Sequence, residues 1–187
     1  MPLLDHFGLL APFYERLIPL QEDKPLWEYL QLPVDGPVLD AGGGTGRVAV
    51  TLKDSAPQIV VADESFKMLQ EAARKDGLQP VGTQAERLPF PDDTFVRVLM
   101  VDALHHVANQ EHTLAELWRV LAPGGLLVIE EPDIRTWTVK GIALMEKVTL
   151  MRSHFLSPAR IVALLPADEA SVEVHTGDFN AWIVARK

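Results

Sequence analysis

Short apolar runs alternate with helix-like patterns between residues 36 and 131 of the chain. Each run is rich in β-branched or aliphatic residues and is bounded by turn residues, which is typical of strands. We expect five strands in this region, at residues 38–39, 58–62, 78–82, 95–101 and 126–130. Strands that alternate with helices build βαβ units, and runs this apolar are typical of a parallel sheet that is buried on both faces.

Two of the intervening helices carry clear signals in the sequence. Ser65 is suited to cap the start of the first. The inward face and the cationic, glycine-terminated end of this helix are formed by Met68, Leu69, Ala72, Ala73, Arg74, Lys75 and Gly77. The second helix should end at the turn 123–125, and its apolar stripe consists of Leu114, Leu117, Trp118 and Leu121.

The two ends of the chain complete the predicted fold. After the fifth strand we expect helices at 139–152 and 158–165, then antiparallel strands at 171–175 and 181–185. Residues 1–32 are rich in aromatic residues and interrupted by prolines, which indicates broken helices packed on the sheet. The sequence thus predicts an α/β fold, a Rossmann-like doubly wound, mostly parallel seven-stranded sheet with an antiparallel C-terminal hairpin and an N-terminal helical cover.

We expect a single domain, because no repeat, low-complexity segment or linker divides the 187 residues. Within it we distinguish an N-terminal helical lid at 1–35, a cofactor-binding core at 36–132, and substrate-side helices with the hairpin at 133–187.

Composition narrows the classes of function. The chain has 26 acidic and 17 basic residues, a net charge of −9, and its Lys and Arg residues form no cluster, which argues against nucleic acid as a partner. The absence of cysteine excludes disulfides, thiolate metal sites and cysteine nucleophiles. No apolar stretch approaches the roughly 20 residues of a membrane helix, and residues 1–10 lack the basic start of a signal peptide. We therefore expect a cytoplasmic protein without an integral membrane segment.

The sharpest feature is a glycine-rich turn, Asp40-Ala41-Gly42-Gly43-Gly44-Thr45-Gly46, that follows the first strand and opens a helix. Glycines there permit positive φ and a close approach of the backbone to a ligand. Asp63 ends the second strand 23 positions after Asp40, near the spacing of roughly 20 at which an acid reaches a ribose in doubly wound folds. We interpret Asp63 as a ribose-binding acid, with a turn acid at a helix start as the alternative.

Two classes of cofactor fit this loop. Residues 44–49 match the G-x-G-x-x-G/A dinucleotide pattern, in which the helix N-terminus holds a pyrophosphate. In the other interpretation the ligand has no phosphate, and Asp40 lies beside the cationic head of an amino-acid moiety.

Several segments, in the same order, resemble the class I S-adenosylmethionine-dependent methyltransferases of the small-molecule type related to ubiquinone/menaquinone C-methyltransferases. The resemblance covers about residues 37–132. It rests on the loop at 38–46, the acid and helix at 62–69, the segment 85–95, Leu-His-His-Val at 104–107 and Leu-Ala-Pro-Gly-Gly at 121–125.

The resemblance implies S-adenosylmethionine as the cofactor, S-adenosylhomocysteine as its product, and no metal ion. The glycine loop would pass under the methionine part, Asp63 would bind the ribose, and residues 84–86 would face the adenine. The cofactor-binding residues that it implies are Asp40, Gly42, Gly43, Gly44, Gly46, Asp63, Glu64, Met68, Gln84, Ala85, Glu86 and Val101.

Two positions depart from the family. Gln84 stands where an acid is more common, and a glutamine offers an acceptor and two donors to the adenine amino group and a ring nitrogen. Val96 stands where the family commonly has an aspartate after the phenylalanine, so the likeness around the fourth strand is weaker there.

Candidate catalytic residues follow the fourth and fifth strands. His106 matches the family's position after the fourth strand and is the candidate base; the alternative is a histidine that caps or packs the next helix. The other candidate bases are Asp102, His105, Glu131 and His154. Tyr14, His105 and Glu131 are the candidates for contact with the substrate or for a lid over it.

Two simpler interpretations accompany these candidates. A metal pair at His105 and His106 is disfavoured, because adjacent side chains diverge. The acids Glu130, Glu131 and Asp133, one of which could line the pocket, are interpreted as solvated turn acids.

The leading hypothesis is transfer of a methyl group to a small-molecule acceptor by in-line displacement, in which the protein aligns and desolvates the nucleophile. An NAD(P)-dependent oxidoreductase and a non-catalytic S-adenosylmethionine-binding protein are the alternatives.

Overall fold

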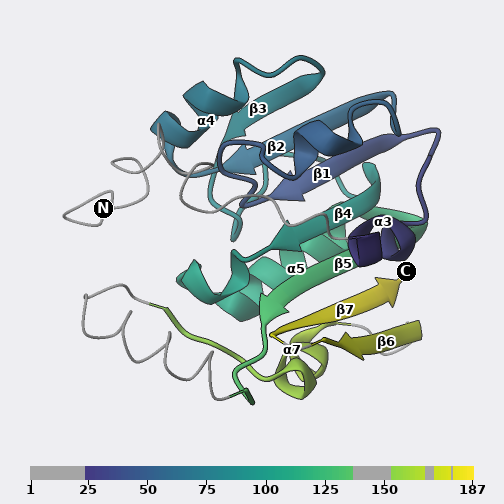
Figure 1. Cartoon of the computed structure of the whole chain (residues 1–187), viewed down its shortest axis with the longest axis vertical. Coiled ribbons are helices and arrows are strands. Elements are labelled where there is room, and N and C mark those ends of the chain that lie inside the picture. Colours follow the sequence, from purple (N-terminus) through teal and green to yellow (C-terminus); the bar gives the residue numbers. More distant parts are fainter. Residues whose placement is uncertain (1–23, 137–152, 167–170, 178) are drawn as a thin grey trace.

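A mixed seven-stranded sheet runs through the centre of the molecule (Figure 1). The computed structural model describes residues 24–136, 153–166, 171–177 and 179–187. Its strands are β1 (Pro37–Ala41), β2 (Gln58–Asp63), β3 (Leu78–Gly82), β4 (Phe95–Val101), β5 (Leu121–Pro132), β6 (Ser171–Thr176) and β7 (Asn180–Arg186). They lie in the order β3-β2-β1-β4-β5-β7-β6, in which β1 to β5 are parallel and β7 is antiparallel to β5 and β6.

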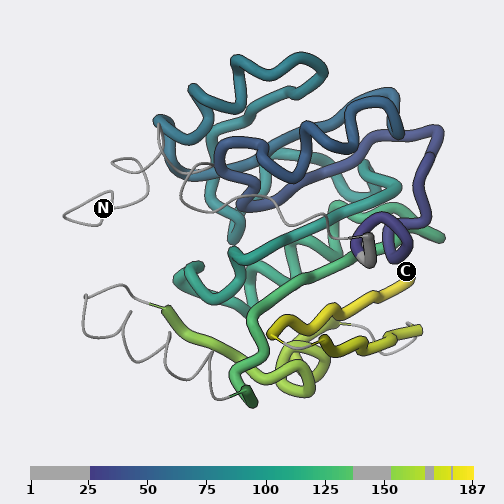
Figure 2. Tube along the Cα trace, viewed as in Figure 1, coloured from purple at the N-terminus to yellow at the C-terminus, as the bar shows by residue number. Residues whose placement is uncertain are grey.

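The predicted sheet is confirmed, including its antiparallel C-terminal hairpin. Strands β3 and β4 have the predicted bounds, and the others extend beyond theirs. The strands β1, β2, β4 and β5 form the centre of the sheet because their β-branched and aliphatic side chains can be buried on both faces. Figure 2 shows the last segment of the chain lying beside β5, where β7 pairs with it.

One helix boundary differs from the prediction. The helix α5 (Gln110–Val120) ends before Leu121, which we had placed on its apolar stripe. Leu121 has extended backbone angles, begins β5 and pairs with Phe95 of β4. It is nonetheless fully buried, because the chain leaves the helix directly into the sheet. The turn expected at 123–125 falls within β5, where Gly124 has a φ of 77°.

Helices cover both faces of the sheet. One face carries α3 (Lys24–Leu30), the 3₁₀ turn η2 (Ala49–Leu52) and α4 (Phe66–Ala72), whose apolar residues form a cluster with those of β1, β2, β4 and β5. The other face carries α5 and α7 (Pro158–Leu164), and a second 3₁₀ turn, η3 (Leu104–His106), follows β4. Figure 1 shows α3 in front of the sheet and α5 behind it.

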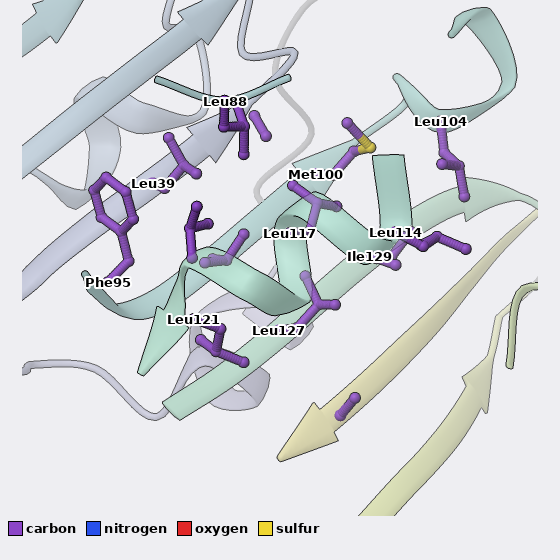
Figure 3. Packing of buried hydrophobic residues seen from close by; sticks show 14 of the residues in the cluster. Leu39, Leu88, Phe95, Met100, Leu104, Leu114, Leu117, Leu121, Leu127 and Ile129 are labelled. Carbon is purple, nitrogen blue, oxygen red and sulfur yellow. The ribbon is translucent and has the colours of Figure 1, made fainter. Parts of the chain in front are cut away.

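The larger core lies between the sheet and α5. Figure 3 shows side chains from β1, β4, β5 and α5 meeting in this cluster. Leu114 and Leu117 of α5 are fully buried there, as the predicted apolar stripe requires. Trp118 packs against the same cluster and is part of the core, as expected.

The expected N-terminal lid is described only from residue 24 onward. Within it, α3 buries Leu26 and Leu30 in the core. The Leu30 carbonyl accepts a hydrogen bond from Arg97 near the start of β4, so this end of α3 lies toward the amino ends of the strands. Tyr14 and the helix predicted at 139–152 lie outside the described residues.

Candidate functional site

The glycine loop leaves the carboxyl end of β1 in a conformation that needs glycine. Gly42, Gly44 and Gly46 have φ values of 70°, 56° and 71°, in the region that side chains disfavour. At Gly43 a side chain is excluded by lack of space instead, because an added Cβ would lie 2.6 Å from the carboxyl group of Asp40. The loop is followed by turns and the short 3₁₀ segment η2, so the regular helix that we expected there is wrong.

Asp63, at the end of β2, holds the glycine loop from the side. Its Oδ2 accepts a hydrogen bond from the Gly44 N–H at 2.9 Å, and its Oδ1 accepts one from the Ser65 N–H at 2.7 Å. Ser65 occupies the predicted N-cap position of α4. The loop and the acid therefore lie together, as the sequence spacing predicts. The hydrogen bond between Asp63 and Gly44 was not predicted from the sequence.

Asp40 lies under the loop and is almost completely buried. Its Oδ2 has no hydrogen-bond partner among the residues that the structure describes. Burial, and secondarily the neighbouring Asp63 carboxylate, raise the pKa of Asp40 to about 7. A cationic group on a ligand would stabilise the ionised form of this side chain.

Arg47 is a residue of the site that the sequence did not single out. Its guanidinium lies 4.0 Å from the Asp102 carboxylate, and its charge favours ionisation of Asp40. Asp102 itself has a φ of 52°, and its N–H donates to the Glu130 carbonyl at the end of β5. The ends of β1, β4 and β5 are thereby connected at one edge of the sheet.

The predicted adenine-side residues lie on the segment after β3. The Thr83 N–H donates to the Asp63 carbonyl, which places this segment next to β2. Gln84 is exposed and Ala85 is half-buried, while the Glu86 carboxylate accepts hydrogen bonds from the N–H groups of Ala108 and Asn109. Glu86 therefore connects this segment to the start of α5.

Other predicted cofactor residues lie around the loop. Met68 is buried, and its sulfur is 4.0 Å from the position of a Cβ added to Gly44. Glu64 is exposed on the turn before α4, and Val101 is half-buried at the end of β4.

The interpretation of the acids around the end of β5 as solvated turn residues is wrong. Glu130, Glu131 and Asp133 are all nearly fully buried. Each carboxylate has a specific partner within the protein. The Asn180 side chain donates to Glu130, and Arg135 forms an ion pair with Asp133. Glu131 is bonded by the Leu104 N–H and His105 Nδ1 of the η3 turn. Buried carboxylates need such partners. The sequence pattern does not identify these partners, because most of them lie far from the acids along the chain.

His105 and Glu131 are brought together as a buried pair. His105 Nδ1 lies 2.6 Å from Glu131 Oε2, and the other carboxylate oxygen accepts a hydrogen bond from the Leu104 N–H at 2.8 Å. The His105 ring stacks on Phe155 with a centroid distance of 4.3 Å.

His106 is half-buried next to this pair. Its Nδ1 lies 3.3 Å from Ser153 Oγ, and its ring centroid is 4.0 Å from that of His105. Burial, with the adjacent His105, lowers the pKa of His106 to about 3, so its imidazole is neutral at physiological pH.

Within the described parts of the chain, no group of three or more His, Asp or Glu side chains could hold a metal ion. No helix of the described residues is long and apolar enough to cross a bilayer.

Residues 39–129 match the methyltransferase-domain family. The matched region contains the glycine loop, Asp63, the η3 turn and most of β5. The chain belongs to the class I S-adenosylmethionine-dependent methyltransferases. This family membership disfavours the dinucleotide interpretation of residues 44–49.

Curated relatives of this chain include two demethylmenaquinone methyltransferases. The one from Deinococcus radiodurans is 40% identical over 101 residues, which cover 50% of this chain and 42% of the relative. The one from Mycobacterium bovis is 36% identical over 146 residues, which cover 78% of this chain and 59% of the relative. The chain therefore spans less than two thirds of either relative.

Solved structures share the fold. An S-adenosylmethionine-dependent methyltransferase from Thermotoga maritima aligns with a TM-score of 0.77 and 24% identity, over 97% of this chain and 98% of the other. The [4+2]-cyclase SpnF aligns with a TM-score of 0.72 and 20% identity, over 87% of this chain and 79% of the other. A cyclase and a methyltransferase on one architecture show that the fold does not determine the reaction.

Proposed function

We propose that this methyltransferase transfers the methyl group of S-adenosylmethionine to a small-molecule acceptor by in-line displacement. The proposal takes Asp40, the glycine loop, Asp63 and the segment 84–86 as the cofactor site. It takes the η3 turn as one wall of the acceptor site.

The observation that carries the proposal is the state of Asp40. Asp40 is buried, its Oδ2 has no partner among the described residues, and its pKa is raised, so its ionised form is costly in the free protein. An ammonium group on a ligand close by would stabilise the ionised carboxylate by its charge, and the methionine part of S-adenosylmethionine carries one. The residues present therefore fit this cofactor.

Asp63 supports the ribose end of the same site. Its carboxylate lies beside the glycine loop, where it accepts from Gly44 and Ser65, and a carboxylate can accept from both hydroxyls of a ribose. We propose that the loop contact holds Asp63 in a fixed orientation, so that little is left to order when a ribose binds.

Bound S-adenosylmethionine supplies an electrophilic methyl group on a sulfonium. The protein has to orient the acceptor, exclude water and accommodate the proton that the acceptor loses. His106 is our candidate for the group nearest the acceptor. As a neutral imidazole it can donate or accept a hydrogen bond at an acceptor hydroxyl or amine.

We further propose demethylmenaquinone, the acceptor in the names of both relatives above, as the first acceptor to try. It should be supplied in its reduced form, because the electron-rich ring of a hydroquinone can attack a methyl cation equivalent and that of a quinone cannot. The reaction should need no metal ion, so EDTA should leave its rate unchanged.

The test is a transfer assay with methyl-tritiated S-adenosylmethionine. We expect radioactivity to enter the acceptor in proportion to the S-adenosylhomocysteine released, with Asp40→Asn much slower than the unmodified chain. Binding of S-adenosylmethionine without transfer to reduced demethylmenaquinone or to a panel of naphthols, catechols and amines would favour the non-catalytic alternative.

A further inference from the structure

Glu131 directs both of its carboxylate oxygens at one turn of the chain. Oε1 accepts from the Leu104 N–H at 2.8 Å, and Oε2 contacts His105 Nδ1 at 2.6 Å. Glu131 lies on β5 and its two partners lie on η3, 26 and 27 residues earlier, so the contact fixes η3 to the neighbouring strand. Both side chains of the pair are about 95% buried, which makes the geometry insensitive to solvent.

The pair also determines which nitrogen of His105 carries a proton. A carboxylate can only accept a hydrogen bond, so its contact with Nδ1 requires an Nδ1–H on His105. Carboxylates that orient a histidine in this way fix both its tautomer and the plane of its ring. A glutamine at position 131 would have the same shape but no charge, and with its oxygen accepting from the Leu104 N–H its NH₂ group would face Nδ1 as a donor and no longer require an Nδ1–H.

His105 in turn joins a second segment of the chain to η3. Its ring stacks on Phe155, and its carbonyl accepts a hydrogen bond from the His154 N–H at 2.7 Å. The Gln110 side chain donates to the carbonyls of both Leu104 and His154.

Ser153, on this second segment, contacts His106 on η3. Ser153 Oγ lies 3.3 Å from His106 Nδ1. The position of His106 thus depends on η3 and on residues 153–155, the two segments that His105 connects.

We propose that Glu131 and His105 are positioning residues for methyl transfer, which hold His106 and Ser153 in place at the acceptor site. This inference rests on the proposed function. It assigns Glu131 no contact with the acceptor: its effect passes through His105 and the η3 turn. Misplacement of a reacting group by about 1 Å can reduce a rate about 100-fold, so the loss of this pair should affect turnover more than binding.

The test compares Glu131→Gln with Asp133→Asn in the full-length chain. Asp133 is an equally buried carboxylate two residues away, but it pairs with Arg135 on its own segment. The acceptor is reduced demethylmenaquinone or, if another member of the panel above reacts faster, that compound. We expect Glu131→Gln to lower kcat at least 10-fold, with the dissociation constant of S-adenosylmethionine changed less than twofold, and Asp133→Asn to leave kcat unchanged.

Imidazole NMR supplies a readout that a purely structural role would not move. In the unmodified protein we expect a strongly downfield, slowly exchanging Nδ1–H resonance from His105. Glu131→Gln should remove this resonance and shift the signals of His106, whereas Asp133→Asn should move neither. If Glu131→Gln does not fold, the resonance in the unmodified protein still decides the point, because its absence overturns the proposal.

The outcomes separate this proposal from the function on which it rests. If the unmodified chain transfers methyl groups and Glu131→Gln does so at the same rate, the positioning role is wrong and the methyltransferase activity stands. If the unmodified chain binds S-adenosylmethionine but transfers nothing to any acceptor, the proposed function fails and the positioning role fails with it.

Discussion

Asp63 Oδ2 accepts a hydrogen bond from the backbone N–H of Gly44 at 2.9 Å, which joins the end of β2 to the loop that follows β1. Gly44 is one of three loop glycines with positive φ, so the acid stabilises a backbone conformation that few residues adopt. The same carboxylate is our candidate ribose acceptor. One side chain therefore shapes the loop and, in our account, binds the ligand that the loop surrounds.

Asp63→Ala should weaken the binding of S-adenosylmethionine about 10- to 150-fold, because a hydrogen bond to a charged acceptor contributes about 1.5–3 kcal/mol. Calorimetric titration measures this change. Asp76→Ala, at an exposed acid after α4, is the matched control and should bind normally. Unchanged affinity in Asp63→Ala would remove Asp63 from the cofactor site.

Gly44→Val should abolish cofactor binding, because a β-branched residue resists a φ of 56° and its side chain would project toward Asp63 and Met68. Gly124→Val is the control: Gly124 also has positive φ, at 77°, and a Cβ there would have no neighbour within 4 Å. Both variants carry backbone strain, but only Gly44 lies in the proposed site. Gly44→Val alone should therefore lose binding. If Gly44→Val binds S-adenosylmethionine with full affinity, the turn is purely structural.

The raised pKa of Asp40 predicts a pH dependence of cofactor affinity. Below pH 7 the free protein carries a protonated Asp40, and a cationic ligand favours the carboxylate, so binding should release a proton. Affinity should increase as the pH rises toward 7, by up to about tenfold per pH unit. The Asp40→Asn variant should lack this contribution, and equal slopes for both proteins would contradict the role of Asp40.

The same pKa has an opposite consequence for stability. The folded chain binds the Asp40 proton more tightly than the unfolded chain, whose Asp pKa is about 4. The contribution of Asp40 to the free energy of unfolding should therefore decrease as the pH rises from about 4 to about 7. Thermal melts of the unliganded chain and of Asp40→Asn across this range measure it, and the difference between them should change with pH.

Deletion of residues 1–20 should reduce methyl transfer more than cofactor binding, since every proposed cofactor residue follows residue 36. The proline-broken, aromatic-rich composition of this segment favours a cover that excludes water from the acceptor. Circular dichroism must first establish that the truncated chain folds. A folded truncation that transfers methyl groups at the full rate would contradict the lid.

The sequence predicted the sheet well because its signals are local. Phe95–Val101 is a continuous apolar run between turn residues, and the glycine loop and Asp63 have the spacing of a βαβ unit. Leu121 was misassigned because the helical period of three to four residues continues by chance into the first residue of β5.

The acceptor side could not be predicted in the same way. A carboxylate such as Glu131 suggests a solvated turn until its partner is known, and His105 lies 26 residues earlier in the sequence. Ser153 and Phe155 belong to no motif, so their contacts with η3 depend on tertiary packing alone.

The most direct test of the central claim is calorimetric titration of the unmodified chain with S-adenosylmethionine and, separately, with NAD⁺. Our account predicts one S-adenosylmethionine bound per chain, loss of that binding in Gly44→Val, and no binding of NAD⁺. Saturable binding of NAD⁺ without any binding of S-adenosylmethionine would contradict the assignment of the loop and of the reaction that we have built on it.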